Sequence, residues 1–135
     1  MILFFDKNIG TGIPIALQNL EPPFKVEYHQ QHFALNELDD KWLPVVGRNH
    51  WTVIGHDRKF HEKESELDAL TKYKIGCFYL WGANATKWEK IKVFFKACDR
   101  IVEAEANTHR PFIYKVKRNG GLRRIKLSKQ QKASN

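Results

Sequence analysis

The stretch DDKWLPVVGRNHWTVIGHDRKF, residues 39–60, has the pattern of a helix followed closely by a buried strand. Apolar residues at 42, 43, 45 and 46 indicate a helix that Asn36 or Asp39 can cap and that Gly47 can end. The apolar run from 51 to 54 then indicates a strand, closed by Gly55-His56-Asp57. A helix joined to a strand by so few residues is typical of α/β proteins.

The rest of the chain repeats this alternation with short connections. Strands are predicted at residues 2–5, 24–29, 75–81 and 111–116, and helices at 13–20, 62–73 and 86–106. A turn at Gly120-Gly121 allows residues 122–127 to pair with the preceding strand at the edge of the sheet. The order predicts an α/β fold with a central, mainly parallel sheet of roughly five strands and helices on both faces.

The long helix predicted at 86–106 carries a regular apolar pattern. Its apolar positions, spaced by three or four residues, are Trp88, Ile91, Phe95, Cys98 and Val102. This spacing is typical of the buried face of an amphipathic helix, so we expect these side chains to face the core. Thr86 is a suitable cap for its first turn.

The size and apolar content of the chain limit its class. At 135 residues it is the size of one domain, for which we expect its own apolar core. The apolar start MILFF is too short for a signal peptide, and no apolar run approaches about 20 residues. We therefore expect a cytoplasmic protein with no membrane segment. Cys77 and Cys98 lie at apolar positions and are expected to be reduced.

The net charge of +8 comes entirely from the last 30 residues, which hold nine Lys or Arg and no Asp or Glu. The basic side chains proposed to track phosphates are Lys115, Lys117, Arg118, Arg123, Arg124 and Lys126. Alternation with apolar residues favours a basic ribbon of two strands that binds nucleic acid. The alternative is a solvated tail that only adds solubility.

Acidic residues close or precede the predicted strands at one edge of the sheet. Asp6 ends the first strand, Asp57 follows the third, and Asp39 and Asp40 open the helix between them. Because ligands bind at the carboxyl ends of parallel strands, these acids can converge there and hold Mg²⁺ or Mn²⁺. Each acid also has a structural interpretation, Asp39 as a helix cap and Asp6 and Asp57 as turn residues.

The histidines carry less information. His29 and His32 form an H-x-x-H pair that could ligate zinc, but a solvated loop is the favoured interpretation because no third ligand accompanies them. His56 precedes Asp57, and its side chain is expected to point away from that acid if the strand continues.

The segment FFDKN at residues 4–8, residues 39–60 and the helix after them together resemble the PIN-like domain family, which is related to toxin ribonucleases of toxin–antitoxin pairs. The resemblance spans residues 2–116. It implies a three-layer α/β/α sandwich over residues 1–116, with residues 117–135 as a basic C-terminal extension. It also implies a Mg²⁺- or Mn²⁺-dependent endoribonuclease that acts on RNA, with an antitoxin protein or a second copy as further partners.

The resemblance carries functional residues onto particular positions. Asp6, Asp40 (or Asp39) and Asp57 match the metal-binding and catalytic acids. The residues expected to contact nucleic acid near them are Asn8, Arg58 and Lys59.

One position departs from the family pattern. Many relatives have a further acid two residues after the one that matches Asp57, where this chain has Lys59. Glu66, from the next helix, is a weak substitute and is more typical of a solvated surface. The departure allows one metal ion instead of two, and it leaves open a noncatalytic PIN-like module that binds nucleic acid.

Overall fold

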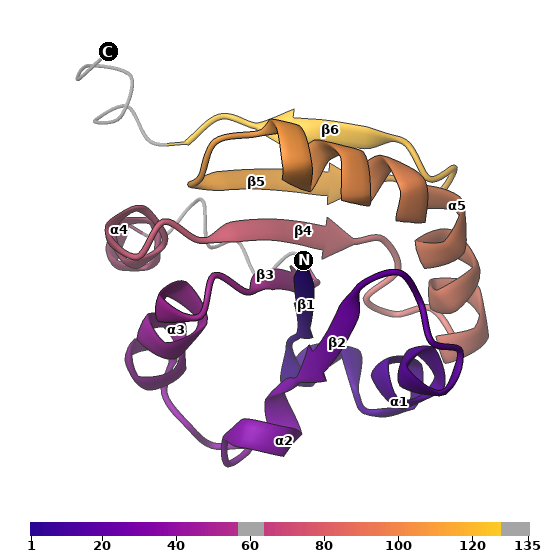
Figure 1. Ribbon diagram of the computed structural model, residues 1–135, viewed down its shortest axis with the longest axis horizontal. Coiled ribbons are helices and arrows are strands. Elements are labelled where there is room, and N and C mark those ends of the chain that lie inside the picture. Colours follow the sequence, from indigo (N-terminus) through magenta and orange to yellow (C-terminus); the bar gives the residue numbers. More distant parts are fainter. Residues whose placement is uncertain (57–63, 128–135) are drawn as a thin grey trace.

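The computed structural model describes residues 1–56 and 64–127, and its helices and strands alternate as the sequence predicts (Figure 1). In chain order, the elements are β1 (Ile2–Phe5), η1 (Lys7–Ile9), α1 (Gly12–Asn19), β2 (Lys25–Tyr28), α2 (His29–His32), α3 (Asp39–Arg48), β3 (Thr52–Gly55), α4 (Glu64–Lys72), β4 (Gly76–Leu80), α5 (Lys87–Asn107), β5 (Phe112–Val116) and β6 (Leu122–Ile125).

The described strands form a six-stranded sheet in the order β2-β1-β3-β4-β5-β6. The first five pair in parallel, which confirms the mainly parallel α/β sheet predicted from the sequence. β6 pairs antiparallel to β5, with Val116 opposite Leu122, and confirms the predicted edge strand. Helices α1 and α5 lie on one side of the twisted sheet and α3 and α4 on the other (Figure 1), which gives the three layers expected from the resemblance.

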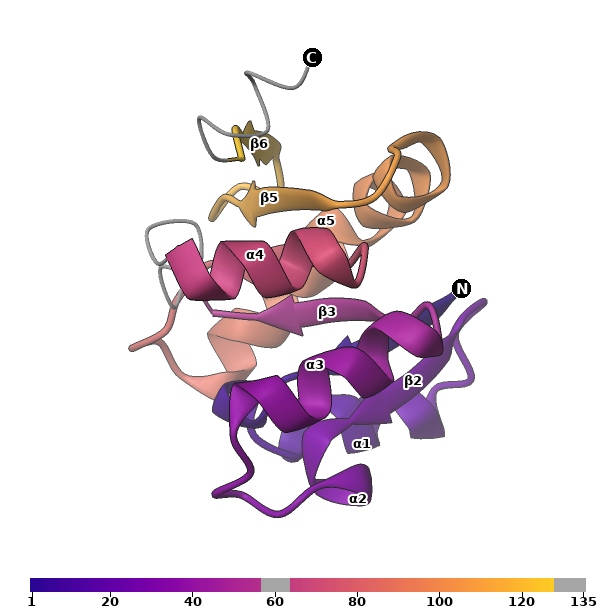
Figure 2. The same cartoon turned by 90° about the vertical axis from the view of Figure 1, so that its left-hand side faces the viewer.

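Alternate side chains of the strands supply two separate cores, one on each face of the sheet. Leu3 and Phe5 of β1 join the core beneath α1 and α5, whereas Phe4 joins the core beneath α3 and α4. Phe4 stacks on both Trp42 and Trp51, with ring centroids 5.7 and 5.4 Å apart. Figure 2 shows α3 and α4 side by side over β3, covering this second core.

The helix α5 does not bury the apolar face predicted from its sequence. Its fully buried apolar residues are Val93, Phe94, Ala97 and Ile101, whereas Trp88 is 72% and Phe95 51% exposed. The predicted residues at 91, 98 and 102 are only partly buried. The helix carries two apolar stripes, and the one formed by Val93, Phe94, Ala97 and Ile101 lies against the sheet.

The ends of α3 also differ from the predictions. Leu38, not Asn36 or Asp39, occupies the N-cap position, and Asp39 lies in the first turn. Gly47 does not end the helix but lies inside it, which continues to Arg48. A Cβ atom at Gly47 would lie 2.6 Å from Cβ of Tyr73, which follows α4. The glycine is therefore needed for the close approach of the chain after α4.

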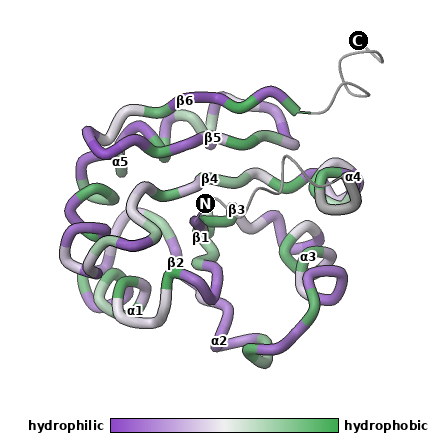
Figure 3. Tube along the Cα trace, turned by 180° about the vertical axis from the view of Figure 1, so that it is seen from behind, coloured by the Kyte–Doolittle hydropathy of each residue, from purple (hydrophilic) through white to green (hydrophobic). Residues whose placement is uncertain are grey.

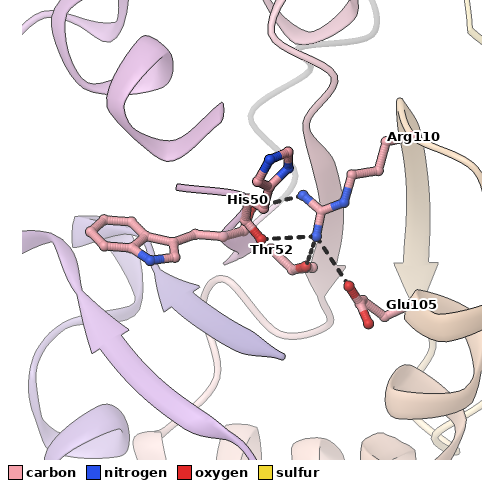
Figure 4. A network of polar contacts seen from close by, with 5 residues as sticks. His50, Thr52, Glu105 and Arg110 are labelled. Atoms are coloured by element: carbon pink, nitrogen blue, oxygen red, sulfur yellow. Dashed lines mark hydrogen bonds and ion pairs between the residues drawn. The ribbon is translucent and has the colours of Figure 1, made fainter. Parts of the chain in front are cut away.

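Arg110 ties the chain before β5 to the start of β3, at the edge of the sheet where the parallel strands begin (Figure 4). Its guanidinium donates to the carbonyl oxygens of His50 (3.2 Å) and Trp51 (3.0 Å) and to Oγ1 of Thr52 (2.6 Å). It also pairs with Glu105 of α5 at 3.1 Å, and both side chains are less than one fifth exposed. One guanidinium thus satisfies acceptors from β3 and α5 together.

We expect Arg110→Met to lower the free energy of unfolding by about 2 kcal/mol, because it leaves several partly buried acceptors without a donor. Urea unfolding at constant m-value measures the change. Arg110→Lys should recover only part of it, since one ammonium cannot reach all four acceptors. The matched control, Arg123→Met on the exposed strand β6, should stay within about 0.5 kcal/mol of the wild type. Equal losses in Arg110→Met and the control would refute the bridging role.

Candidate functional site

Asp6 lies directly after β1 at the carboxyl edge of the sheet and is 1% exposed. Its amide donates to the carbonyl oxygen of Ile54 (2.9 Å), which continues the pairing of β1 with β3. Its carboxylate packs against the backbone of Gly55, where a Cβ atom would lie 3.5 Å from Oδ2. The fold therefore holds this acid in one buried position, where strand ends commonly bind ligands.

His56 follows β3 at the same edge and is 5% exposed. Its Nδ1 lies 3.0 Å from the carbonyl oxygen of Leu80, at the end of β4. A carbonyl can only accept, so Nδ1 carries the hydrogen and Nε2 is left as an acceptor in the neutral ring. Nε2 has no hydrogen-bond partner among the described residues.

Burial lowers the pKa of His56 below its ordinary value of 6.5. The hydrogen bond to Leu80 and the negative charge of Asp6 oppose this shift, and the positive charge of Lys90 adds to it. The charges of Asp6 and Lys90 therefore act on the His56 ring in opposite directions. The ring is neutral at pH 7 and can accept a hydrogen bond or coordinate an ion through Nε2.

Two lysines from the start of α5 approach this edge. Lys90 is 8% exposed, and its Cγ would lie 3.8 Å from a Cβ atom on Gly82, in the connection that follows β4. The stem of Lys87 passes over the turn before α1, with Cδ 3.5 Å from the Cβ position of Gly12. The helix begins as predicted, since Oγ1 of Thr86 accepts from the amide of Glu89 (3.2 Å). These ammonium groups favour an anion at the edge.

Asp39 and Asp40 occupy the first turn of α3, as the sequence predicts. The carboxylate of Asp39 accepts a hydrogen bond from Nε1 of Trp42 (2.9 Å), so it fixes the indole that stacks on Phe4. Asp40 is exposed. Across residues 1–56 and 64–127, no three His, Cys, Asp or Glu side chains lie close enough to hold a metal ion.

Several predicted site residues lie outside the part of the chain that the structure describes. They are Asp57, Arg58 and Lys59, and the side chain of Glu66 is not described either. The cluster of Asp6, Asp57 and Asp39 or Asp40 therefore stays a prediction. Asn8 is placed in η1, two residues after Asp6, with its side chain exposed.

The solvated loop predicted around His29 and His32 is wrong. These residues form the short helix α2, and His29 is fully buried, with Nε2 3.0 Å from the carbonyl oxygen of Ala34. His32 lies 3.0 Å from Glu27 and packs against Trp51, with ring centroids 4.9 Å apart. Aromatic packing holds both rings, which the polar sequence around them did not indicate.

The predicted basic ribbon forms from β5 and β6. Lys115 lies opposite Arg123, and Tyr114 opposite Arg124. Lys115, Arg123, Arg124 and Lys126 line an open hollow of about 240 Å³. The turn between the strands packs on α5, because Nη1 of Arg100 donates to the carbonyl oxygen of Gly120 (3.4 Å).

A second basic surface connects this ribbon to the strand ends. Trp81 follows β4, and the guanidinium of Arg118 lies over its ring, 5.2 Å from the centroid. A hollow of about 90 Å³ beside them is lined by Lys92 and Lys96 as well. An indole with stacked and flanking cations is suited to a nucleic-acid base and its phosphate. The predicted contact Arg118 is part of this surface, together with Lys117, which is exposed at the same turn.

Sequence reasoning missed four of these residues: His56, Trp81, Lys87 and Lys90. The strand-end rule that identified Asp6 applies equally to His56 and Trp81, which follow β3 and β4. The two lysines were hidden by the assignment of the wrong face of α5 to the core. Lys90 lies three residues before Val93, on the same face of the helix, and a lysine at such a position gives no signal of burial by itself.

The match to a family model agrees with this geometry. The model of the PIN like domain matches residues 1–82, from β1 through the end of β4. No curated protein and no solved structure matches the chain. Since the matched part exceeds half of the sequence, the chain belongs to the PIN-like domain family, which generally covers nucleases. None of the described helices is both long enough and apolar enough to cross a membrane.

The lowered pKa of His56 predicts how stability depends on pH. The unfolded chain takes up a proton on this histidine at a higher pH than the folded protein does. The contribution of the neutral ring to the free energy of unfolding is therefore complete above about pH 6.5 and is lost as the pH falls below that value. We expect His56→Asn, which keeps a donor near Leu80, to weaken this loss. Chemical unfolding in EDTA from pH 5 to pH 8 compares the two proteins, and parallel curves would contradict the assignment.

Proposed function

We propose that this protein is a Mg²⁺- or Mn²⁺-dependent endoribonuclease that hydrolyses RNA phosphodiester bonds at the carboxyl edge of its sheet. The observation that carries the proposal is the burial of Asp6 at the end of β1 in a chain of the PIN-like family. A buried acid beside a neutral histidine and two lysines is an arrangement expected of a ligand site more than of a solvated surface.

The residues present fit one divalent ion. Asp6 offers oxygen donors and His56 a nitrogen donor, and the next residue in the chain is Asp57. Mg²⁺ is commonly held by one or two carboxylates and several waters, so Asp6 and Asp57 would suffice. When bound, such an ion activates a water and neutralises charge on a phosphodiester. The positive charge of Lys90 beside His56 disfavours a second ion.

The chain's own residues would position the substrate. Lys87 and Lys90 attract the phosphate group and offset the negative charge that accumulates on it during hydrolysis. The neutral ring of His56 accepts a hydrogen bond through Nε2 and can orient a water or a sugar hydroxyl. Trp81 and Arg118 lie next along the edge and would stack a base, and the ribbon of β5 and β6 continues the basic surface.

A second candidate function is a PIN-like module that binds nucleic acid without cleaving it. The observation that favours it is the set of side chains at the edge. The described residues supply one buried carboxylate there. The buried Lys90 and the exposed Lys87 both favour an anion at this edge over a metal cation. Lys59 in place of an acid points the same way. Metal dependence separates the two candidates.

We expect Asp6→Asn to reduce RNA cleavage in Mg²⁺ or Mn²⁺ about a hundredfold or more, because it removes the charge that holds the ion. EDTA should abolish cleavage by the wild type and either metal should restore it. The matched control is Asp68→Asn, an exposed acid on α4, which should cleave like the wild type. RNA affinity in EDTA should not fall in either variant. Binding without any cleavage by the wild type would establish the noncatalytic module.

The family resemblance also supports a finer proposal, a toxin that is neutralised by an antitoxin protein. In that case, induced expression of the wild type arrests bacterial growth, and the Asp6→Asn variant does not. Growth arrest by both proteins would separate the toxicity from RNA cleavage.

The basic ribbon should determine much of the salt dependence of RNA binding. We expect the triple variant Arg123→Gln, Arg124→Gln, Lys126→Gln to bind RNA more weakly, with a slope of log affinity against log salt reduced by about 0.7 for each lost phosphate contact. The control removes three exposed cations from β2 and α3 through Lys25→Gln, Lys41→Gln and Arg48→Gln. Equal effects of the two triple variants on RNA affinity and on the salt slope would show that the ribbon only adds solubility.

A further inference from the structure

Beside the face that it buries, α5 carries a second apolar stripe, which is partly packed against the core at Ile91, Cys98 and Val102 and exposed at Trp88 and Phe95. It consists of Trp88, Ile91, Phe95, Cys98 and Val102, and its two aromatic residues are the most exposed of the set. Figure 3 shows α5 at the rim of the molecule, with hydrophobic and hydrophilic residues alternating along its length. We call these five residues the outer stripe of α5. Exposed aromatic groups in a row are typical of a surface that another molecule covers.

The spacing of the outer stripe indicates what kind of element covers it. Its steps of three, four, three and four residues are those of a seven-residue repeat, which keeps one face of a helix against a partner helix. The stripe extends over about 20 Å of the helix at 1.5 Å per residue. This length and regularity fit a second helix lying along α5.

The charges of α5 indicate which partner helix covers the outer stripe. The first ten residues of the helix, Lys87–Lys96, hold four lysines and one glutamate, whereas Ala97–Asn107 holds three acids and one arginine. Lys92 and Asp99 are one repeat apart, exposed, and on the same flank of the outer stripe. A helix that is basic at its start and acidic at its end is complementary to a copy of itself that runs in the opposite direction.

We propose that two copies of this chain dimerise through the outer stripe of α5, with the two helices antiparallel about a twofold axis. Phe95 lies near the axis, Trp88 of each copy lies toward Val102 of the other, and Lys92 of each copy faces Asp99 of the other. Each charge pair therefore occurs twice, as in any isologous interface. Because α5 begins at the carboxyl edge of the sheet, the two edges lie at opposite ends of the dimer.

Sedimentation velocity of the full chain tests the dimer, over about 1–300 μM because a contact of one helix pair is small and its affinity modest. We expect a monomer–dimer equilibrium that Phe95→Glu abolishes. The matched control is Leu35→Glu, which places the same charge at an apolar residue that is 62% exposed and distant in sequence from α5. Circular dichroism verifies that both variants are folded. A wild type that is monomeric throughout, or a Phe95→Glu variant that still dimerises, overturns the proposal.

Charge reversal tests the antiparallel arrangement. Lys92→Glu and Asp99→Lys should each weaken dimerisation about tenfold, because each turns two attractive pairs into two repulsive ones. The double variant, which restores both pairs with exchanged signs, should dimerise like the wild type. A parallel pairing would not place Lys92 opposite Asp99 and would give no such rescue, so failure of the double variant overturns the proposed pairing.

The inference is independent of the proposed nuclease activity, because mass and not cleavage is measured. A dimer can form whether or not Asp6 supports hydrolysis.

Discussion

The packing of Phe4 between Trp42 and Trp51 is the contact on which the rest of the site depends. It ties β1 to α3 and to the chain entering β3, and it lies in the core beneath α3 and α4. Since side chains alternate along a strand, burying Phe4 on this face fixes the register of β1, and a slip by one residue would turn every side chain to the other face. Asp6, two residues later, is held at the strand end by that register.

A parallel sheet covered on both faces gathers its strand ends at one edge, and this constraint places the residues of the candidate site. Asp6, His56 and Trp81 come from three neighbouring strands and share nothing in sequence except their position after a strand. Lys87 and Lys90 join them because the crossover from β4 to β5 starts α5 at that edge. The resulting site combines one buried acid, one neutral histidine and two cations, which suits an anionic substrate better than a cluster of several metal ions.

The helix α5 serves three parts of the molecule at once. Its inner face fills the core with Val93, Phe94, Ala97 and Ile101, its first turn supplies lysines to the edge of the sheet, and its flank carries the turn between β5 and β6 through Arg100. Within the outer stripe, Ile91, Cys98 and Val102 pack partly against the core, whereas Trp88 and Phe95 stay exposed in the described monomer, which is why we assign them to a contact with a second copy. The division of one helix into faces with separate roles follows from its period of 3.6 residues.

The sequence by itself determined the alternation of strands and helices, the mainly parallel sheet, the edge strand β6 and the position of Asp6 at a strand end. These features follow from local periodicity and from where apolar runs stop, and both are properties of neighbouring residues. Tertiary structure alone decided which of the two stripes of α5 faces the sheet, why Gly47 lies inside α3, and that His29 is buried. Each of these depends on how closely a distant element approaches, Tyr73 against Gly47 or Phe4 against His29, and local sequence carries no record of that distance.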